Sequence, residues 1–114
     1  MLDDDTPLFN LAQVAMLRDA LGADELSIMY RQLPGSIGRS LDAIDAALAA
    51  GDLAAIRRSS HALKGVAGSF AAVRLEAIAR RLELDVMSLA EAAACREALV
   101  AIARHTEDGV QAMV

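Results

Sequence analysis

The chain has 114 residues, of which 55% are hydrophobic and only 3% aromatic, so it can form one domain with one core and its composition favours helices over strands. The formal net charge of −5 argues against nonspecific nucleic-acid binding, and the single cysteine excludes an internal disulfide and a cysteine-rich metal site. No apolar run approaches the roughly 18 residues that a membrane-spanning helix needs.

The N-terminal part predicts a tail followed by one short helix. Residues 1–7 are interpreted as a flexible tail, and their acidic sequence is unlike a signal peptide. Thr6 can cap a helix that begins with Pro7, because proline is tolerated at the first helical position. We expect this leader helix to continue to about Leu21 and to stop at Gly22.

A long amphipathic helix is predicted next. Asp24 can cap it, and apolar residues then recur at steps of three and four, which is typical of a helix with one buried face. Pro34 and Gly35 interrupt this pattern, so we expect a kink near residues 30–35 rather than a break. Gly51 ends the helix.

Three further helices complete the predicted fold. Asp52 caps a helix over about 53–68, another begins near Ala71, and the last covers about 89–112. Because the connections are short, consecutive helices should be antiparallel neighbours. The sequence therefore predicts a single all-α domain over 1–114, an antiparallel four-helix bundle with a short N-terminal leader helix.

The predicted 53–68 helix places His61 on its outward side. A helix advances about 100° per residue, which puts Ile56 and Leu63 on the side opposite His61. The residues within about 60° of His61 are cationic or small: Ala54, Arg57, Arg58, Lys64, Gly65 and Gly68. Since the glycines face away from the core, we interpret them as clearance for a second molecule or for a bulky group on a ring nitrogen.

This arrangement favours phosphoryl chemistry on His61. Imidazole is substantially neutral near pH 7, so a ring nitrogen is nucleophilic without an activating base. Lys64, one turn along, can neutralise an anion attached to that nitrogen, whereas Arg57 and Arg58 either assist it or form an ordinary solvated face. The chain has no phosphate-binding glycine loop and no carboxylate cluster suited to magnesium, so a partner must supply the remaining machinery.

The octet HALKGVAG, residues 61–68, resembles the H-x-[LI]-K-G-x-[AS]-[GA] signature of histidine-containing phosphotransfer (HPt) domains. The AALAAGDLAAIRR segment before the histidine and the LEAIARRLE segment after the octet also resemble this family. The sequence departs from the family at Ala71, where many members carry glycine. The resemblance implies a four-helix bundle with the histidine exposed midway along one helix.

The resemblance also implies a function. His61 would accept a phosphoryl group from a receiver-domain aspartate and pass it to another receiver, with electrostatic assistance from Lys64. Docking and clearance would involve Gly65, Gly68, Ala54, Arg57, Arg58 and Ala62. The domain would need no cofactor of its own, because the receiver would bring the acidic pocket and its Mg²⁺.

Two other functions stay open at this point. The chain could be the phosphodonor domain of a chemotaxis-type histidine kinase, supplied from ATP by a separate domain, or a non-catalytic helical interaction domain. The end at Val114 favours a standalone protein or a C-terminal module, such as that of a hybrid sensor histidine kinase. We expect a cytoplasmic domain, free or tethered to a membrane sensor, without nucleic-acid partners or direct membrane insertion. No metal site is expected, since Cys95 and the two histidines lack ligand spacing.

Overall fold

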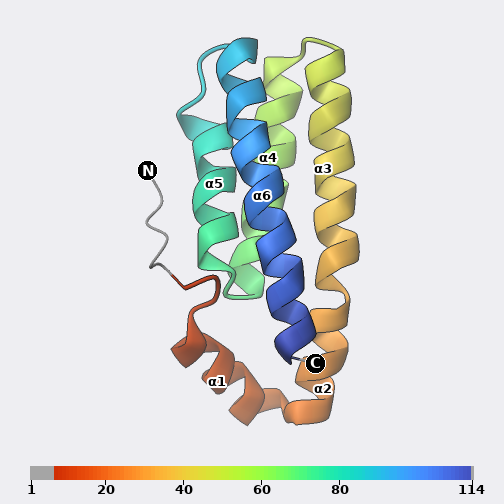
Figure 1. Cartoon of the computed structure of the whole chain (residues 1–114), viewed down its shortest axis with the longest axis vertical. Helices are drawn as coiled ribbons and strands as arrows, with labels where there is room; N and C mark the ends of the chain where they lie inside the picture. Colours follow the sequence, from red (N-terminus) through yellow and green to blue (C-terminus); the bar gives the residue numbers. More distant parts are fainter. Residues whose placement is uncertain (1–6, 114) are drawn as a thin grey trace.

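The computed structural model describes residues 7–113, and this part of the chain forms six helices and no strand. The helices are α1 (Leu11–Leu21), α2 (Ala23–Arg31), α3 (Leu33–Ala49), α4 (Leu53–Ser69), α5 (Val73–Leu84) and α6 (Leu89–Met113). The last four run along the long axis of the molecule, whereas α1 and α2 lie at one end (Figure 1). α4 packs between α3 and α5, and α6 packs against α5 and α3, which closes the predicted four-helix bundle. The predicted all-α fold is confirmed.

The leader helix α1 begins at Leu11 rather than at Pro7. Thr6, the expected cap, lies outside the described residues. Asn10 caps the helix instead, because its Oδ1 accepts a hydrogen bond from the backbone N–H of Gln13 at 3.1 Å.

The burial of Phe9 explains this later start. Its side chain is 5% exposed, and its ring meets the Tyr30 ring edge-on with the centroids 5.9 Å apart. The backbone N–H of Asn10 donates to the carbonyl of Ala71 at 2.8 Å. A Cβ atom at Gly109 would lie 2.9 Å from the Phe9 ring, so the glycine lets this segment lie against α6. The chain immediately before α1 therefore packs against the bundle and does not form the first turn of the helix.

Gly22 separates the first two helices. Its φ of +86° ends α1, as predicted, and suits a residue without a side chain. The chain enters α2 at once, at Ala23, so Asp24 lies in the first turn and is not the cap that the sequence suggested. Its negative charge in the first turn still interacts favourably with the positive end of the helix dipole.

The kink expected in the long second helix is an interruption of one residue. α2 ends at Arg31 and α3 begins at Leu33, while Gln32 between them keeps a right-handed backbone with φ −81° and ψ −18°. Pro34 has no N–H to donate, so the interruption falls where the helical hydrogen bonding is already broken.

The start of α4 agrees with its prediction. Oδ1 of Asp52 accepts a hydrogen bond from the backbone N–H of Ala55 at 3.0 Å, which is the predicted cap. Gly51 has a φ of +66° in the turn that separates α3 from α4. α4 and α6 each extend one residue beyond the predicted ends, to Ser69 and Met113.

The turn between α4 and α5 differs from the prediction. α5 begins at Val73 rather than near Ala71, because Ala71 has a φ of +56° and this left-handed backbone cannot continue a right-handed helix. The hydroxyl of Tyr30 donates to the carbonyl of Phe70 at 2.6 Å and holds the turn from the side of α2.

The core is mainly aliphatic and lies between the four bundle helices, and it continues to Phe9 and to Tyr30 of α2. Its fully buried large side chains include Leu33, Ile37, Ile44, Ile56, Leu63, Leu75, Ile78, Leu82 and Leu99. Within residues 7–113, every helix is either too short or too polar to serve as a bilayer span.

Candidate functional site

His61 lies in the middle of α4, on the side away from the core. Leu63 and Ala67 of the same helix are fully buried, whereas the side chain of His61 is 68% exposed. The ring is therefore accessible to a second molecule, as its place in the helical periodicity predicted.

A carboxylate from the neighbouring helix joins the two polar side chains of the octet. Glu83, in the last turn of α5, has Oε2 at 2.5 Å from Nδ1 of His61 and Oε1 at 2.6 Å from Nζ of Lys64. Its side chain is only 14% exposed, so α4 and α5 together shield this carboxylate from water. One carboxylate thus holds both the imidazole and the ammonium in place.

These contacts determine which ring nitrogen of His61 is free to react. An ionised carboxylate can only accept hydrogen bonds, so Nδ1 must carry the proton that it donates to Glu83. In the neutral ring, Nε2 then carries the lone pair. The nucleophilic nitrogen is therefore the one that Glu83 does not occupy.

The two donors also keep Glu83 ionised. The hydrogen bond from Lys64 lowers the pKa of the carboxyl group most, and the hydrogen bond from His61 lowers it further, against the opposing effect of burial. The carboxylate therefore remains anionic, and an acceptor for Nδ1, well into the acid range.

Lys64 has a partner that its sequence position did not indicate. We expected its ammonium beside His61, available to an anion on the ring. In the structure the ammonium is paired with Glu83, and its side chain is 28% exposed. Its positive charge lies next to the imidazole through the shared carboxylate.

The two glycines of the octet face different surroundings. No atom lies within 4 Å of a Cβ added at Gly65, which agrees with the interpretation as clearance. A Cβ at Gly68 would lie 3.2 Å from Oε2 of Glu76, because this side of α4 faces α5. Gly68 is therefore less open than Gly65, because an added side chain there would press on the flexible end of the Glu76 side chain.

The adjacent arginines also differ. Nη2 of Arg57 donates to the backbone carbonyl of Val86 at 3.0 Å, in the connection between α5 and α6. Arg58 is exposed. Both line an open hollow together with His61 and Glu83. Arg57 thus links α4 to the connection between α5 and α6, whereas the charge of Arg58 faces solvent.

Small residues surround the histidine on its other flank. Ala54 and Ala62 are exposed on α4, as expected for a docking surface. Ala62 also lines a groove between α3 and α4, with the residues Ser36, Arg39, Ser40, Ala43, Ser59 and Val66. A partner that reaches His61 from this side meets Ala62 and Gly65 of α4, together with the exposed side chain of Arg58.

Glu83 was not predicted from the sequence, and the register of the helical hairpin is the signal that indicates it. α4 and α5 are antiparallel and joined by the short turn at 70–72, so residues nearly equidistant from the turn lie opposite each other. The contacts that follow this rule are His61 with Glu83, Gly68 with Glu76, and Arg57 with Val86.

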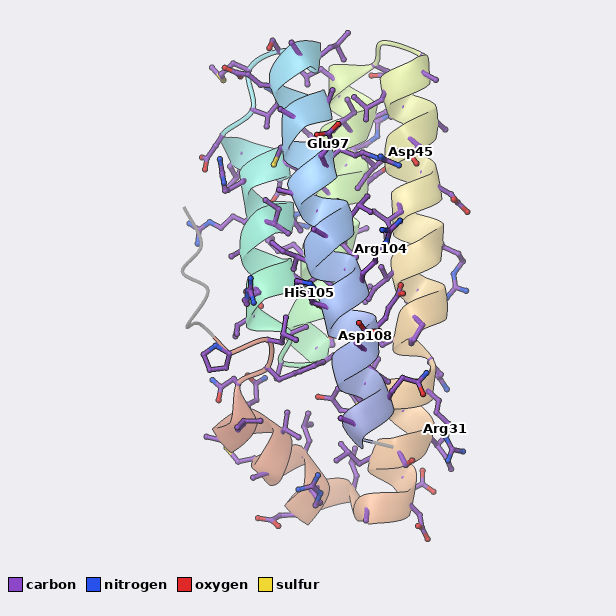
Figure 2. The ribbon with its side chains drawn as sticks, viewed as in Figure 1. Arg31, Asp45, Glu97, Arg104, His105 and Asp108 are labelled. Atoms are coloured by element: carbon purple, nitrogen blue, oxygen red, sulfur yellow. The ribbon has the colours of Figure 1, made fainter. Side chains whose placement is uncertain are left out.

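The second histidine lies on another helix. His105 is exposed on α6, near Arg104 and Asp108 (Figure 2), and α6 is not adjacent to α4 in the bundle. Cys95 is buried on the same helix, about 15 Å away at 1.5 Å per residue, which is too far to share a metal ion. Among the described side chains, no three potential ligands are grouped for a metal.

Comparisons with known proteins identify the family and the fold of the chain. The family model of the Hpt domain matches residues 12–113. The crystal structure of histidine-containing phosphotransfer protein B (HptB) from Pseudomonas aeruginosa PAO1 is similar over 94% of this chain and 94% of that chain, with a TM-score of 0.84 and 22% sequence identity, which establishes a shared fold. No curated protein matches the chain. Because the family match covers most of its length, the chain belongs to the Hpt domain family, the histidine phosphotransfer domains that exchange phosphoryl groups with receiver domains in phosphorelays.

Proposed function

We propose that His61 carries the phosphoryl group on Nε2, taking it from the aspartyl phosphate of one receiver domain and passing it to the aspartate of another. The observation that supports this role is an exposed imidazole whose other nitrogen is held by Glu83. The ring is fixed, the correct nitrogen is free, and the helix around it offers room for a partner.

The chemistry requires little from this chain. The lone pair of Nε2 forms an N–P bond while the bond between phosphorus and the aspartate oxygen breaks, and the aspartate leaves as a carboxylate. In the second transfer a carboxylate oxygen attacks phosphorus, and the electron pair of the N–P bond returns to Nε2. The proton on Nδ1 stays in its hydrogen bond to Glu83, so neither step needs a proton transfer.

Lys64 acts electrostatically in this proposal. Attack by Nε2 leaves positive charge on the ring, which the Glu83 carboxylate stabilises, but the same carboxylate repels the incoming anionic phosphoryl group. The ammonium of Lys64, 2.6 Å from Oε1 of Glu83, offsets that repulsion without releasing the imidazole. Loss of Lys64 should therefore slow transfer while His61 remains the acceptor.

The partner supplies what the chain does not. We expect a receiver domain, free or in the same polypeptide as a hybrid sensor kinase, to dock around Gly65, Ala54, Ala62 and Arg58 and to bring the Mg²⁺ of its own acidic pocket. This role places the domain in the cytoplasm, free or tethered to a sensor.

The test is transfer from a labelled receiver. The chain is incubated with a phosphorylated receiver domain, and the label it acquires should be labile to acid and stable to alkali. His61→Gln should acquire none, whereas His105→Gln, which changes the exposed histidine of α6, should be labelled like the parent. Equal labelling of the parent and His61→Gln would refute the proposal.

A further inference from the structure

We propose that Arg57 is a positioning residue, whose hydrogen bond to the carbonyl of Val86 fixes the end of α5 and thereby holds the Glu83 carboxylate against Nδ1 of His61. Its effect on transfer rests on the proposed function of His61. Its effect on the imidazole concerns the unphosphorylated protein and can be measured without any transfer.

Glu83 lies near the C-terminal end of α5, in the part of a helix that its own hydrogen bonds hold least firmly. It is the last residue but one of α5 (Val73–Leu84), and the final turn of a helix lacks donors for its carbonyls and frays readily. The N–H of Asp85 still donates to the carbonyl of Arg81 at 2.9 Å, but the chain then leaves the helix, and α6 begins only at Leu89. The position of Glu83 thus depends on what anchors the residues that follow it.

Val86 is the anchor, and it is held in two ways. Its side chain is 5% exposed and packs in the core, and its carbonyl accepts the hydrogen bond from Nη2 of Arg57 at 3.0 Å. Arg57 lies on α4 one turn before His61. The helix that carries the imidazole therefore also fixes the chain three residues beyond the carboxylate that the imidazole needs.

The His61–Glu83 hydrogen bond is the contact most sensitive to this anchor. The imidazole is short and rigid, so it cannot follow a carboxylate that moves with a fraying helix end. Lys64 has a flexible four-carbon chain and can keep its pairing with Glu83 after such a movement. Loss of the Arg57 hydrogen bond should therefore leave the Lys64–Glu83 pair and release Nδ1.

The test compares Arg57→Met with Arg58→Met, the matched change at the adjacent, exposed arginine. Nitrogen-15 spectra of the unphosphorylated protein report which ring nitrogen of His61 carries the proton. In Arg57→Met the Nδ1 and Nε2 signals should move towards each other, because the Nε2–H form gains population, whereas Arg58→Met should keep the parent spectrum. Transfer from a phosphorylated receiver should fall about three- to tenfold in Arg57→Met, since misplaced reacting groups lose their orientation.

Arg57→Lys keeps one donor and should give an intermediate spectrum and rate, and it carries the test if Arg57→Met does not fold. An unchanged tautomer in Arg57→Met, or an equal change in Arg58→Met, would overturn the proposal. Slower transfer with an unchanged tautomer would also overturn it, because Arg57 would then act on the phosphoryl group as a cation. If no variant and not even the parent accepts a phosphoryl group, the function of His61 is wrong, while the tautomer shift still decides the role of Arg57.

Discussion

Glu83 holds two donors that serve different purposes. His61 gives its Nδ1 proton to one carboxylate oxygen, which leaves Nε2 for chemistry, and Lys64 gives an ammonium proton to the other. Each contact depends on the negative charge of the carboxylate. Both hydrogen bonds therefore depend on the ionisation of the Glu83 side chain.

This dependence predicts how stability responds to acid. The hydrogen bonds from Lys64 and His61 lower the pKa of Glu83 in the folded protein, so the unfolded chain takes up this proton first as the pH falls. The contribution of Glu83 to stability is complete above the ordinary carboxyl pKa of about 4.3 and is lost as the pH falls through the lower folded-state pKa. Urea unfolding should show Glu83→Gln less stable than the parent near neutral pH.

The difference between the two proteins should begin to shrink below about pH 4, where the unfolded parent takes up a proton at Glu83, and should disappear only below the lower pKa of the folded parent. Glu76→Gln, at the other carboxylate that α5 presents to α4, serves as the control and should not reproduce this pH profile. A stability gap that persists unchanged into strong acid would contradict the assigned role of Glu83.

At Gly65 we predict that the size of the side chain, rather than its charge, controls the transfer rate. Because an added Cβ meets nothing within 4 Å, Gly65→Ala should raise the free energy of unfolding by about 0.5–1 kcal/mol through helix propensity alone. Gly65→Leu should keep the fold and slow transfer from a receiver, because its side chain enters the space beside His61. Thermal unfolding and transfer kinetics measure the two effects.

Gly38 in α3 provides the matched control, since it too is helical and has open space at its missing Cβ. Gly38→Ala should gain similar stability, and Gly38→Leu should leave the transfer rate near that of the parent. A large loss of stability in Gly65→Ala would show instead that Gly65 is structural, and parent-like transfer by Gly65→Leu would remove the argument for clearance.

At the scale of elements, the turn between α4 and α5 sets the register of the site. Ala71 is buried with a φ of +56°, Tyr30 binds the carbonyl of Phe70, and Asn10 binds that of Ala71. These contacts fix how far α5 is displaced along α4, and so they decide which residue of α5 lies opposite His61. The turn thus acts on the site although none of its residues contacts the His61–Glu83 pair in the hydrogen bonds described.

Substitutions at Ala71 should reveal the strain in this turn. Ala71→Gly should change the free energy of unfolding little, because relief of about 1 kcal/mol of left-handed strain is offset by the greater chain entropy of glycine. Ala71→Val should lose about 2 kcal/mol or more, since a branched side chain tolerates this backbone poorly. Denaturant titrations would measure both, and a stable Ala71→Val variant would contradict the backbone geometry.

At the scale of the whole molecule, α6 closes the bundle against α5 and α3. Arg96 of α6 makes two hydrogen bonds to Asp45 of α3, at 2.8 and 3.0 Å, and Asp45 lies on the α3 face beside α6 (Figure 2). Cys95, the residue before Arg96, is 9% exposed and contributes to the core. Closure of the bundle therefore protects this thiol.

The reactivity of Cys95 should report whether the bundle is closed. Burial raises the pKa of its thiol, which reduces the reactive thiolate, and also blocks access of a reagent. Labelling by a water-soluble disulfide reagent should be slow in the native protein and fast in urea, with the rate following the unfolding transition. Fast labelling without urea would mean that α6 separates from α5 at urea concentrations far below those that unfold the protein.

Local sequence patterns predict the four bundle helices and the exposed position of His61. Helical periodicity is a local property, so a leucine stripe and a histidine opposite it are readable from spacing alone. The helix ends at Gly22 and Gly51 and the cap at Asp52 were also predicted correctly. A positive φ or a capping oxygen affects only residues close in the sequence, so these features can be recognised locally.

The surroundings of the imidazole depend instead on how the helices pack against one another. The polar half of α4 looks uniform in sequence, but α5 covers the part that holds Arg57, Lys64 and Gly68 and leaves Gly65 open. Which carboxylate meets Nδ1 depends on the register between two helices, and that register is set by the packing of the turn and the core. Helical spacing identifies His61 as the exposed imidazole because exposure follows from one helix, whereas the pairing of His61 with Glu83 depends on two.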